Sequence, residues 1–112
     1  MSERDTIAAT RGTLGEDLAC SFLVKKGMSI LVRNFRVKGG EIDIIARVGS
    51  ELVFVEVKTR TNATFGYPEE SVTRQKLLRC SRAMRAYLMT HQSFESYRFD
   101  VVAIQLDLQT RK

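Results

Sequence analysis

The sequence contains one histidine, one proline, two cysteines and no tryptophan among its 112 residues. A single histidine cannot supply a metal site built from several imidazoles. The sequence also gives no indication of a Ser-His-Asp catalytic triad. The two cysteines, Cys20 and Cys80, form neither a CxxC pair nor a disulfide framework. We therefore expect two buried thiols in a reducing cytoplasm.

Long apolar segments and phosphate-binding glycine motifs are also missing. The strongest apolar run, Leu52–Val55, is interrupted by Glu56, whereas a membrane-spanning helix needs about 20 apolar residues. The N-terminal residues are polar, and neither GxxxxGK[ST] nor GxGxxG occurs. We expect a cytoplasmic protein without a membrane segment and without nucleotide-driven activity.

Positive charge is in excess on a chain that can form one core. Lys and Arg number 18 against 13 Asp and Glu, which gives a formal net charge of +5, and 44% of the residues are hydrophobic. A chain of this length can bury one core but not two. We predict a single globular domain over residues 1–112, with flexible tails at 1–10 and 108–112. The charge favours a polyanionic partner, although it is also typical of a hydrated surface.

Two segments have the periodicity of amphipathic helices. Leu14, Leu18 and Phe22 recur at every fourth position, which predicts a helix over about 13–27. Apolar residues at spacings of three and four predict a second helix over about 72–91, with Ser71 as its cap.

The remaining segments predict strands. Runs rich in β-branched and aromatic residues lie at 29–36, 41–48 and 51–60, and Gly49-Ser50 joins the last two as an antiparallel hairpin. Residues 61–70 indicate a functional loop, and 97–108 indicate a last strand. The order αβββαβ predicts an α/β sandwich in which helices flank a mixed sheet.

Charged residues occupy alternate positions in the strand at 51–60. Glu56, Lys58 and Arg60 project from one side of it, because successive side chains of a strand point to opposite faces. Apolar residues divide between the two faces, which indicates a central strand covered on both sides: Leu52 and Phe54 on the side of Glu56, and Val53, Val55 and Val57 on the other.

Asp43, on the preceding strand, is a second acidic candidate. Regular alternation puts Glu41, Asp43 and Ile45 on one face, and the hairpin brings Asp43 opposite Val55 or Glu56. A one-residue change of register, or a bulge, decides which face Asp43 joins. Only one of these arrangements brings the two carboxylates together.

Two carboxylates and an ammonium group suit the hydrolysis of phosphodiesters. Mg²⁺ takes carboxylate and water ligands and leaves positions for a phosphate oxygen. We therefore expect Asp43 and Glu56 to hold Mg²⁺ or Mn²⁺, and Lys58 to orient the attacking water or to balance charge in the transition state. The alternative for the same residues is an ion network at the end of the sheet.

Three segments resemble a known family: GTLGEDLACSFLVKKGMSILVRNFR, GGEIDIIARVGSELVFVEVKTR and FGYPEESVTRQKLLRCSRAMRAYL. They are similar to the bacterial YraN-like family over nearly the whole chain, and GEIDIIA with FVEVKTR is the most specific part. That family resembles the restriction-endonuclease-like PD-(D/E)xK superfamily, and especially the archaeal Holliday junction resolvases. The resemblance implies an αβββαβ nuclease fold.

The resemblance also implies roles for four residues. Asp43 matches the motif aspartate, and Glu56 and Lys58 match the E-x-K pair. Glu16 matches a helix glutamate that completes the metal site of the resolvases, although a glutamate in a first helical turn also favours the helix dipole.

Basic and amide side chains near the motif are candidates for contacts with phosphate: Arg60, Gln75, Lys76 and Arg79. Such contacts position a strand without reading its bases, and exposed basic residues otherwise only hydrate. The expected partner is nucleic acid, DNA first. A homodimer would allow both strands of a branched substrate to be cut.

The leading hypothesis is thus a metal-dependent endonuclease that acts on DNA, branched or structured. One alternative is a non-catalytic nucleic-acid-binding module on the same scaffold, whose binding would be salt-sensitive and independent of metal. Another is a protein-interaction domain in which the charged residues form only an ion network.

Overall fold

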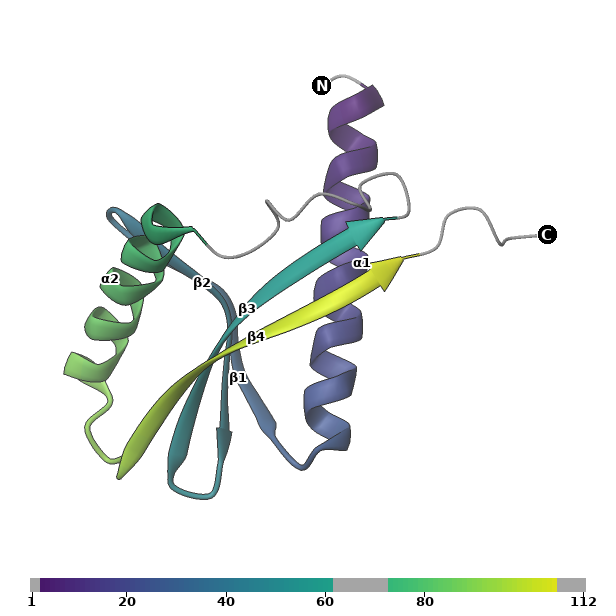
Figure 1. Cartoon of the computed structure of the whole chain (residues 1–112). Helices are drawn as coiled ribbons and strands as arrows, with labels where there is room; N and C mark the ends of the chain where they lie inside the picture. Colours follow the sequence, from purple (N-terminus) through teal and green to yellow (C-terminus); the bar gives the residue numbers. More distant parts are fainter. Residues whose placement is uncertain (1–2, 62–72, 107–112) are drawn as a thin grey trace.

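The computed structural model describes residues 3–61 and 73–106, with side chains placed from residue 13 onward. The expected cap Ser71, the tail at 108–112 and nearly all of the loop at 61–70 lie outside the described residues. Figure 1 shows a single sheet with one helix on each side.

The order of elements is αβββαβ, as the sequence predicted. The helices and strands are α1 Glu3–Lys25, β1 Ser29–Val37, β2 Gly40–Val48, β3 Glu51–Thr61, α2 Arg74–Thr90 and β4 Ser96–Leu106.

The boundaries of both helices differ from the expected ones. α1 begins at Glu3, well before the expected start near residue 13, and ends at Lys25. α2 begins at Arg74 rather than near residue 72, because Thr73 is its N-cap and accepts a hydrogen bond from the backbone N–H of Lys76 at 3.1 Å. Over the described residues, neither helix is long and apolar enough to cross a membrane.

The sheet is mixed and its strands lie in the order β1-β2-β3-β4. β1 pairs antiparallel with β2, and β2 pairs antiparallel with β3. β4 pairs in parallel with β3 along its whole length, and α2 is the crossover between them. The expected hairpin and the mixed sheet are therefore confirmed.

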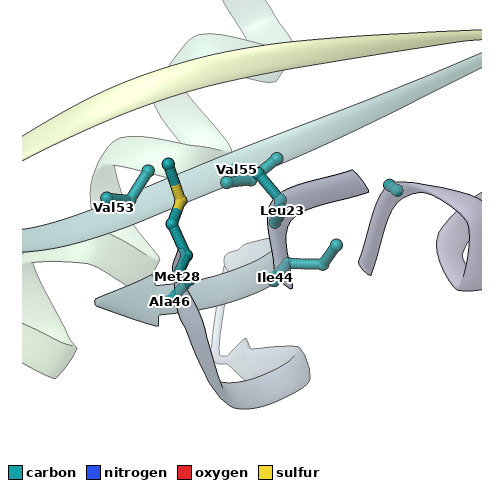
Figure 2. Close-up of a cluster of buried hydrophobic side chains, with 7 residues drawn as sticks. Leu23, Met28, Ile44, Ala46, Val53 and Val55 are labelled. Carbon is teal, nitrogen blue, oxygen red and sulfur yellow. The ribbon is translucent and has the colours of Figure 1, made fainter. Parts of the chain in front are cut away.

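Each face of the sheet packs against one helix. The cluster on the α1 side, drawn in Figure 2, contains Ala19, Leu23, Met28, Ile44, Ala46, Val53 and Val55. The cluster on the α2 side contains Ile42, Ile45, Leu52, Phe54, Cys80, Ala83 and Tyr87. Val53 and Val55 thus face away from Leu52 and Phe54, as the alternation in β3 predicted.

β2 does not alternate regularly, and here the expectation was wrong. Ile42 and Ile45 pack on the α2 side while Ile44 packs on the α1 side, so the alternation breaks around Asp43. Asn34 of β1, which lies level with this break, has a positive φ of 57°. Asn is one of the few residues other than glycine that adopt this conformation readily. The expected common face of Glu41, Asp43 and Ile45 is therefore not formed.

Gly15 allows α1 to approach β3 closely. A Cβ atom at this position would collide with Oγ1 of Thr59 and lie 3.2 Å from its Cβ. The contact brings the helix turn that carries Glu16 onto the end of β3.

We predict opposite effects of Gly15→Ala in two backgrounds. With Thr59 present, alanine should destabilise the fold by about 1–3 kcal/mol through overpacking. In a Thr59→Gly background both the Oγ1 and the Cβ contacts are absent, and the helix propensity of alanine should make Gly15→Ala neutral or stabilising by up to about 1 kcal/mol. Urea unfolding of the four proteins measures this cycle. If the effects of the two substitutions on the free energy of unfolding were additive, residues 15 and 59 would not be in contact.

Candidate active site

Asp43 lies where β2 and β3 separate. Their last paired residues are Ile44 and Val55. Beyond this point the backbone N–H of Val57 donates to Oδ2 of Asp43 at 2.7 Å. The aspartate side chain thus replaces the backbone acceptor that β2 no longer offers, and it points toward β3.

Glu56 is a buried carboxylate that α2 holds by both oxygens. Its side chain is 3% exposed, and Nζ of Lys76 lies 2.8 Å from Oε2. The thiol of Cys80 donates to Oε1 at 3.7 Å. Lys76 and Cys80 are four residues apart and so lie on one side of the helix. A buried carboxylate needs such partners, because burying an unpaired charge is strongly unfavourable.

Glu16 approaches the same region from α1. Its Oε1 accepts hydrogen bonds from Nδ2 of Asn34 at 3.0 Å and from the Arg33 guanidinium at 3.4 Å. Arg33 also forms an ion pair with Asp17 at 2.8 Å. Asn34, the residue with positive φ in β1, therefore also fixes the direction of the Glu16 carboxylate.

A pocket of about 250 Å³ lies between the separated strands and the two helices. Its lining contains three expected acidic residues together with Lys76: Glu16, Glu41, Asp43, Glu56, Val57, Thr59 and Lys76. The strand separation at Asp43 thus creates a small polar pocket with four carboxylates on its walls.

Negative charge accumulates around Asp43. Burial, above all, raises the pKa of Asp43 from 3.8 to about 6, and the charges of Glu56 and Glu16 raise it further, against the opposing effect of the Val57 N–H. The hydrogen bond to Glu56 likewise raises the pKa of the Lys76 ammonium. A cation beside Asp43 would relieve the repulsion between these carboxylates.

The expected residues divide into two groups. Glu16, Asp43, Glu56 and Lys76 line the pocket, whereas Lys58 and Arg60 do not. Lys58 is half-buried, lies beside Ala103 of β4 and has no ion pair or side-chain hydrogen bond within residues 3–61 and 73–106. Two other residues expected to bind nucleic acid are exposed on α2, namely Gln75 and Arg79.

Three contributors were not expected from the sequence. Cys80 binds Glu56, Asn34 binds Glu16, and Glu41 forms an ion pair with Arg79 at 3.0 Å. The four-residue spacing of Lys76 and Cys80 placed them on one helix face. Only the packing of α2 against the sheet shows that this face meets Glu56.

The acidic pair has the chemistry that Mg²⁺ or Mn²⁺ requires. Among residues 3–61 and 73–106, no three carboxylate, thiol or imidazole groups converge as a ready-made metal cage. Mg²⁺ usually binds through one or two carboxylates and keeps several waters. Asp43 and Glu56 fit a hydrated ion of this kind, and Glu16 would have to move closer to become a third ligand.

The sequence of this chain matches a known protein family. A model of the uncharacterised protein family UPF0102 matches residues 15–104. The chain belongs to this family. The match includes every residue that lines the pocket, and it confirms the resemblance to the YraN-like family.

Several UPF0102 proteins are similar over most of their length. The chain is 49% identical to one from Moorella thermoacetica over 102 residues, which cover 90% of this chain and 85% of the relative. It is 47% identical over 96 residues to one from Dictyoglomus thermophilum, covering 85% and 81%. It is 50% identical over 97 residues to one from Chlorobium limicola, covering 86% and 75%.

We predict that Asp43→Asn stabilises the protein at neutral pH. Because the pKa of Asp43 is higher in the folded protein than its usual 3.8, the protonated form contributes stability below about pH 4. That contribution is lost as the pH rises through about 6. Asparagine keeps an acceptor for the Val57 N–H without the charge, and should add on the order of 2 kcal/mol at pH 7.5.

Thermal unfolding of wild type and variant from pH 4 to pH 8 measures this effect. The variant Asp43→Asn should become increasingly more stable than wild type as the pH rises from 4 toward 8. Glu95→Gln, at an exposed position away from the pocket, is the matched control, and it should change the stability little. A variant that is less stable than wild type at pH 7.5 would contradict the assigned pKa.

Proposed function

We propose that this protein is a metal-dependent endonuclease that hydrolyses phosphodiester bonds in DNA, with Asp43 and Glu56 as ligands of Mg²⁺ or Mn²⁺. The observation that carries the proposal is the convergence of these two carboxylates from neighbouring strands in one pocket. The raised pKa of Asp43 supports it, because perturbed acids in pockets are frequent at functional sites.

In the proposed reaction an oxygen of water bonds to phosphorus, the bond from phosphorus to the leaving oxygen breaks, and that oxygen takes up a proton. When bound, the divalent ion polarises the phosphoryl group and lowers the pKa of a water. Asp43 would contribute the oxygen that Val57 does not use. Glu56 would contribute Oε1, because Oε2 is engaged by the Lys76 ammonium, whereas the contact of Oε1 with the Cys80 thiol is long at 3.7 Å.

The surface of α2 supports nucleic acid as the partner. The helix contains five basic residues and no acidic one: Arg74, Lys76, Arg79, Arg82 and Arg85. Arg79 and Arg82 are held by Glu41 and by the carbonyl of Gly39. Arg74 and Arg85 have no partner in the described part of the chain and would contact phosphates. Arg60 and Gln75 are further candidates for such contacts.

DNA with branches or other structure is the substrate we propose, from the resemblance to junction resolvases. Two copies of the chain would be needed to cut both strands of a junction. A cytoplasmic location is part of the proposal, because DNA and divalent ions are both present there.

Cleavage assays test the activity directly. Purified protein should cut at least one of four DNA substrates (junction, flap, single strand or duplex) when Mg²⁺ or Mn²⁺ is added. Asp43→Asn and Glu56→Gln should each lower the rate by about 100-fold or more, because each removes a ligand charge at the reaction centre. Glu95→Gln, outside the pocket, should cut like wild type. Cleavage that survives both active-site variants would come from a contaminant.

A second candidate function is metal-independent binding of nucleic acid, which the basic face of α2 favours. In either case, Arg74→Ala and Arg85→Ala should each weaken DNA binding for all sequences and lower the slope of log affinity against log salt by about 1. Lys25→Ala, on α1, makes the same charge change away from this face and should have little effect. Equal effects of all three substitutions would contradict a specific role of α2.

Calorimetry separates the two candidates. Heat of Mg²⁺ or Mn²⁺ binding that disappears in Asp43→Asn supports the nuclease. If ion binding is absent in wild type while DNA binding remains, the binding module is the better description.

A further inference from the structure

Lys76 is fixed in the pocket by both its backbone and its side chain. Its backbone N–H donates to the side chain of the N-cap Thr73 at 3.1 Å. Its ammonium lies 2.8 Å from Oε2 of Glu56, while 42% of the side chain remains exposed. The group is therefore oriented toward the carboxylate and still accessible to a ligand from solvent.

The partner of Lys76 is almost fully buried and is itself well fixed. The side chain of Glu56 is 3% exposed, and its second oxygen accepts from Cys80. The ammonium has three N–H donors, and Glu56 takes one of them. The other donors can reach a phosphate that enters the pocket, without any change in the contact with Glu56.

Lys58 does not share this placement. It follows Glu56 by two residues on β3 but is not part of the pocket lining, which includes its neighbours Val57 and Thr59. The reason lies in the position of α2, whose first turn brings Lys76 against Glu56. The amine closest to the carboxylate thus comes from the helix and not from the strand that carries the E-x-K sequence.

We propose that Lys76, rather than Lys58, supplies the amine at the reaction centre and contacts the phosphoryl oxygens of the bound DNA. This inference rests on the proposed nuclease function. The ammonium keeps its proton throughout. It stabilises the negative charge that grows on the phosphoryl oxygens as the water adds to phosphorus, and the fixed contact with Glu56 holds it in place beforehand.

A purely structural role of Lys76 predicts different effects of its replacement. If Lys76 only neutralises the buried charge of Glu56, its replacement lowers stability but leaves the cleavage rate of the folded protein unchanged. A role in catalysis lowers the rate at saturating DNA. The rate must therefore be measured on folded protein, under conditions where all the DNA is bound.

The experiment compares Lys76→Met, Lys76→Arg and Lys58→Met with wild type in single-turnover cleavage at saturating DNA. Lys76→Met should lower the rate by about 100-fold. Lys76→Arg should retain more activity, because it keeps the charge, and Lys58→Met should cut at close to the wild-type rate. Calorimetric affinity for Mn²⁺ should not weaken in Lys76→Met, since a neighbouring positive charge has been removed.

A second measurement does not depend on turnover. DNA affinity is measured with and without Ca²⁺, which supports binding without cleavage in many metal-dependent nucleases. Lys76→Met should lose much of the gain in affinity that Ca²⁺ gives to wild type, and Lys58→Met should keep it. Should Lys76→Met fail to fold, Lys76→Gln replaces it, because its amide donates a neutral hydrogen bond to Glu56.

The outcomes separate the two proposals. Cleavage that survives Lys76→Met and is lost in Lys58→Met overturns the assignment of Lys76 and leaves the nuclease in place. If wild type does not cut DNA, but the gain in affinity from Ca²⁺ is lost in Lys76→Met and in no other variant, Lys76 is a phosphate contact and the proposed catalysis is wrong. If wild type neither cuts nor gains affinity from Ca²⁺, both proposals fail.

Discussion

The site depends on one hydrogen bond, from the backbone N–H of Val57 to the side chain of Asp43. β2 and β3 stop pairing after Ile44 and Val55, which would leave the N–H of Val57 without a partner in the sheet. A partly buried N–H of this kind is unfavourable unless an acceptor reaches it. Asp43 supplies that acceptor, and the strands can then diverge around a pocket without losing the hydrogen bond.

Asp43 has an unusually high pKa in spite of this contact. A backbone donor normally favours the charged form of a carboxylate, yet burial and the neighbouring charges outweigh it, and the pKa rises to about 6. A neutral side chain would make the folded protein more stable at neutral pH. The retained charge is understandable if a cation or a cationic side chain belongs in the pocket, and Lys76 meets part of that need through Glu56.

The features that the sequence predicted are those that follow from a regular period. The alternation of Val53 and Val55 with Leu52 and Phe54 in β3 gave the two covered faces, and it held because β3 is continuous. At Asp43 the sequence left open a change of register or a bulge, because a pattern of alternating residues does not show where the alternation breaks. The positive φ of Asn34 on the neighbouring strand is visible only in the structure. The proximity of Lys76 and Glu56 depends on how α2 packs against the sheet, and local sequence patterns do not predict this packing.

The parallel pairing of β3 with β4 has a consequence for how the chain reaches its final state. β1, β2 and β3 are joined by short turns, whereas β4 can align with β3 only after the long excursion through α2. Closing that longer loop carries a greater entropic penalty, and contacts distant in sequence form more slowly than local ones. The meander that carries Asp43 and Glu56 can therefore assemble first. Lys76 then arrives with the crossover helix, so the acidic pair spends the early part of folding without its ammonium partner.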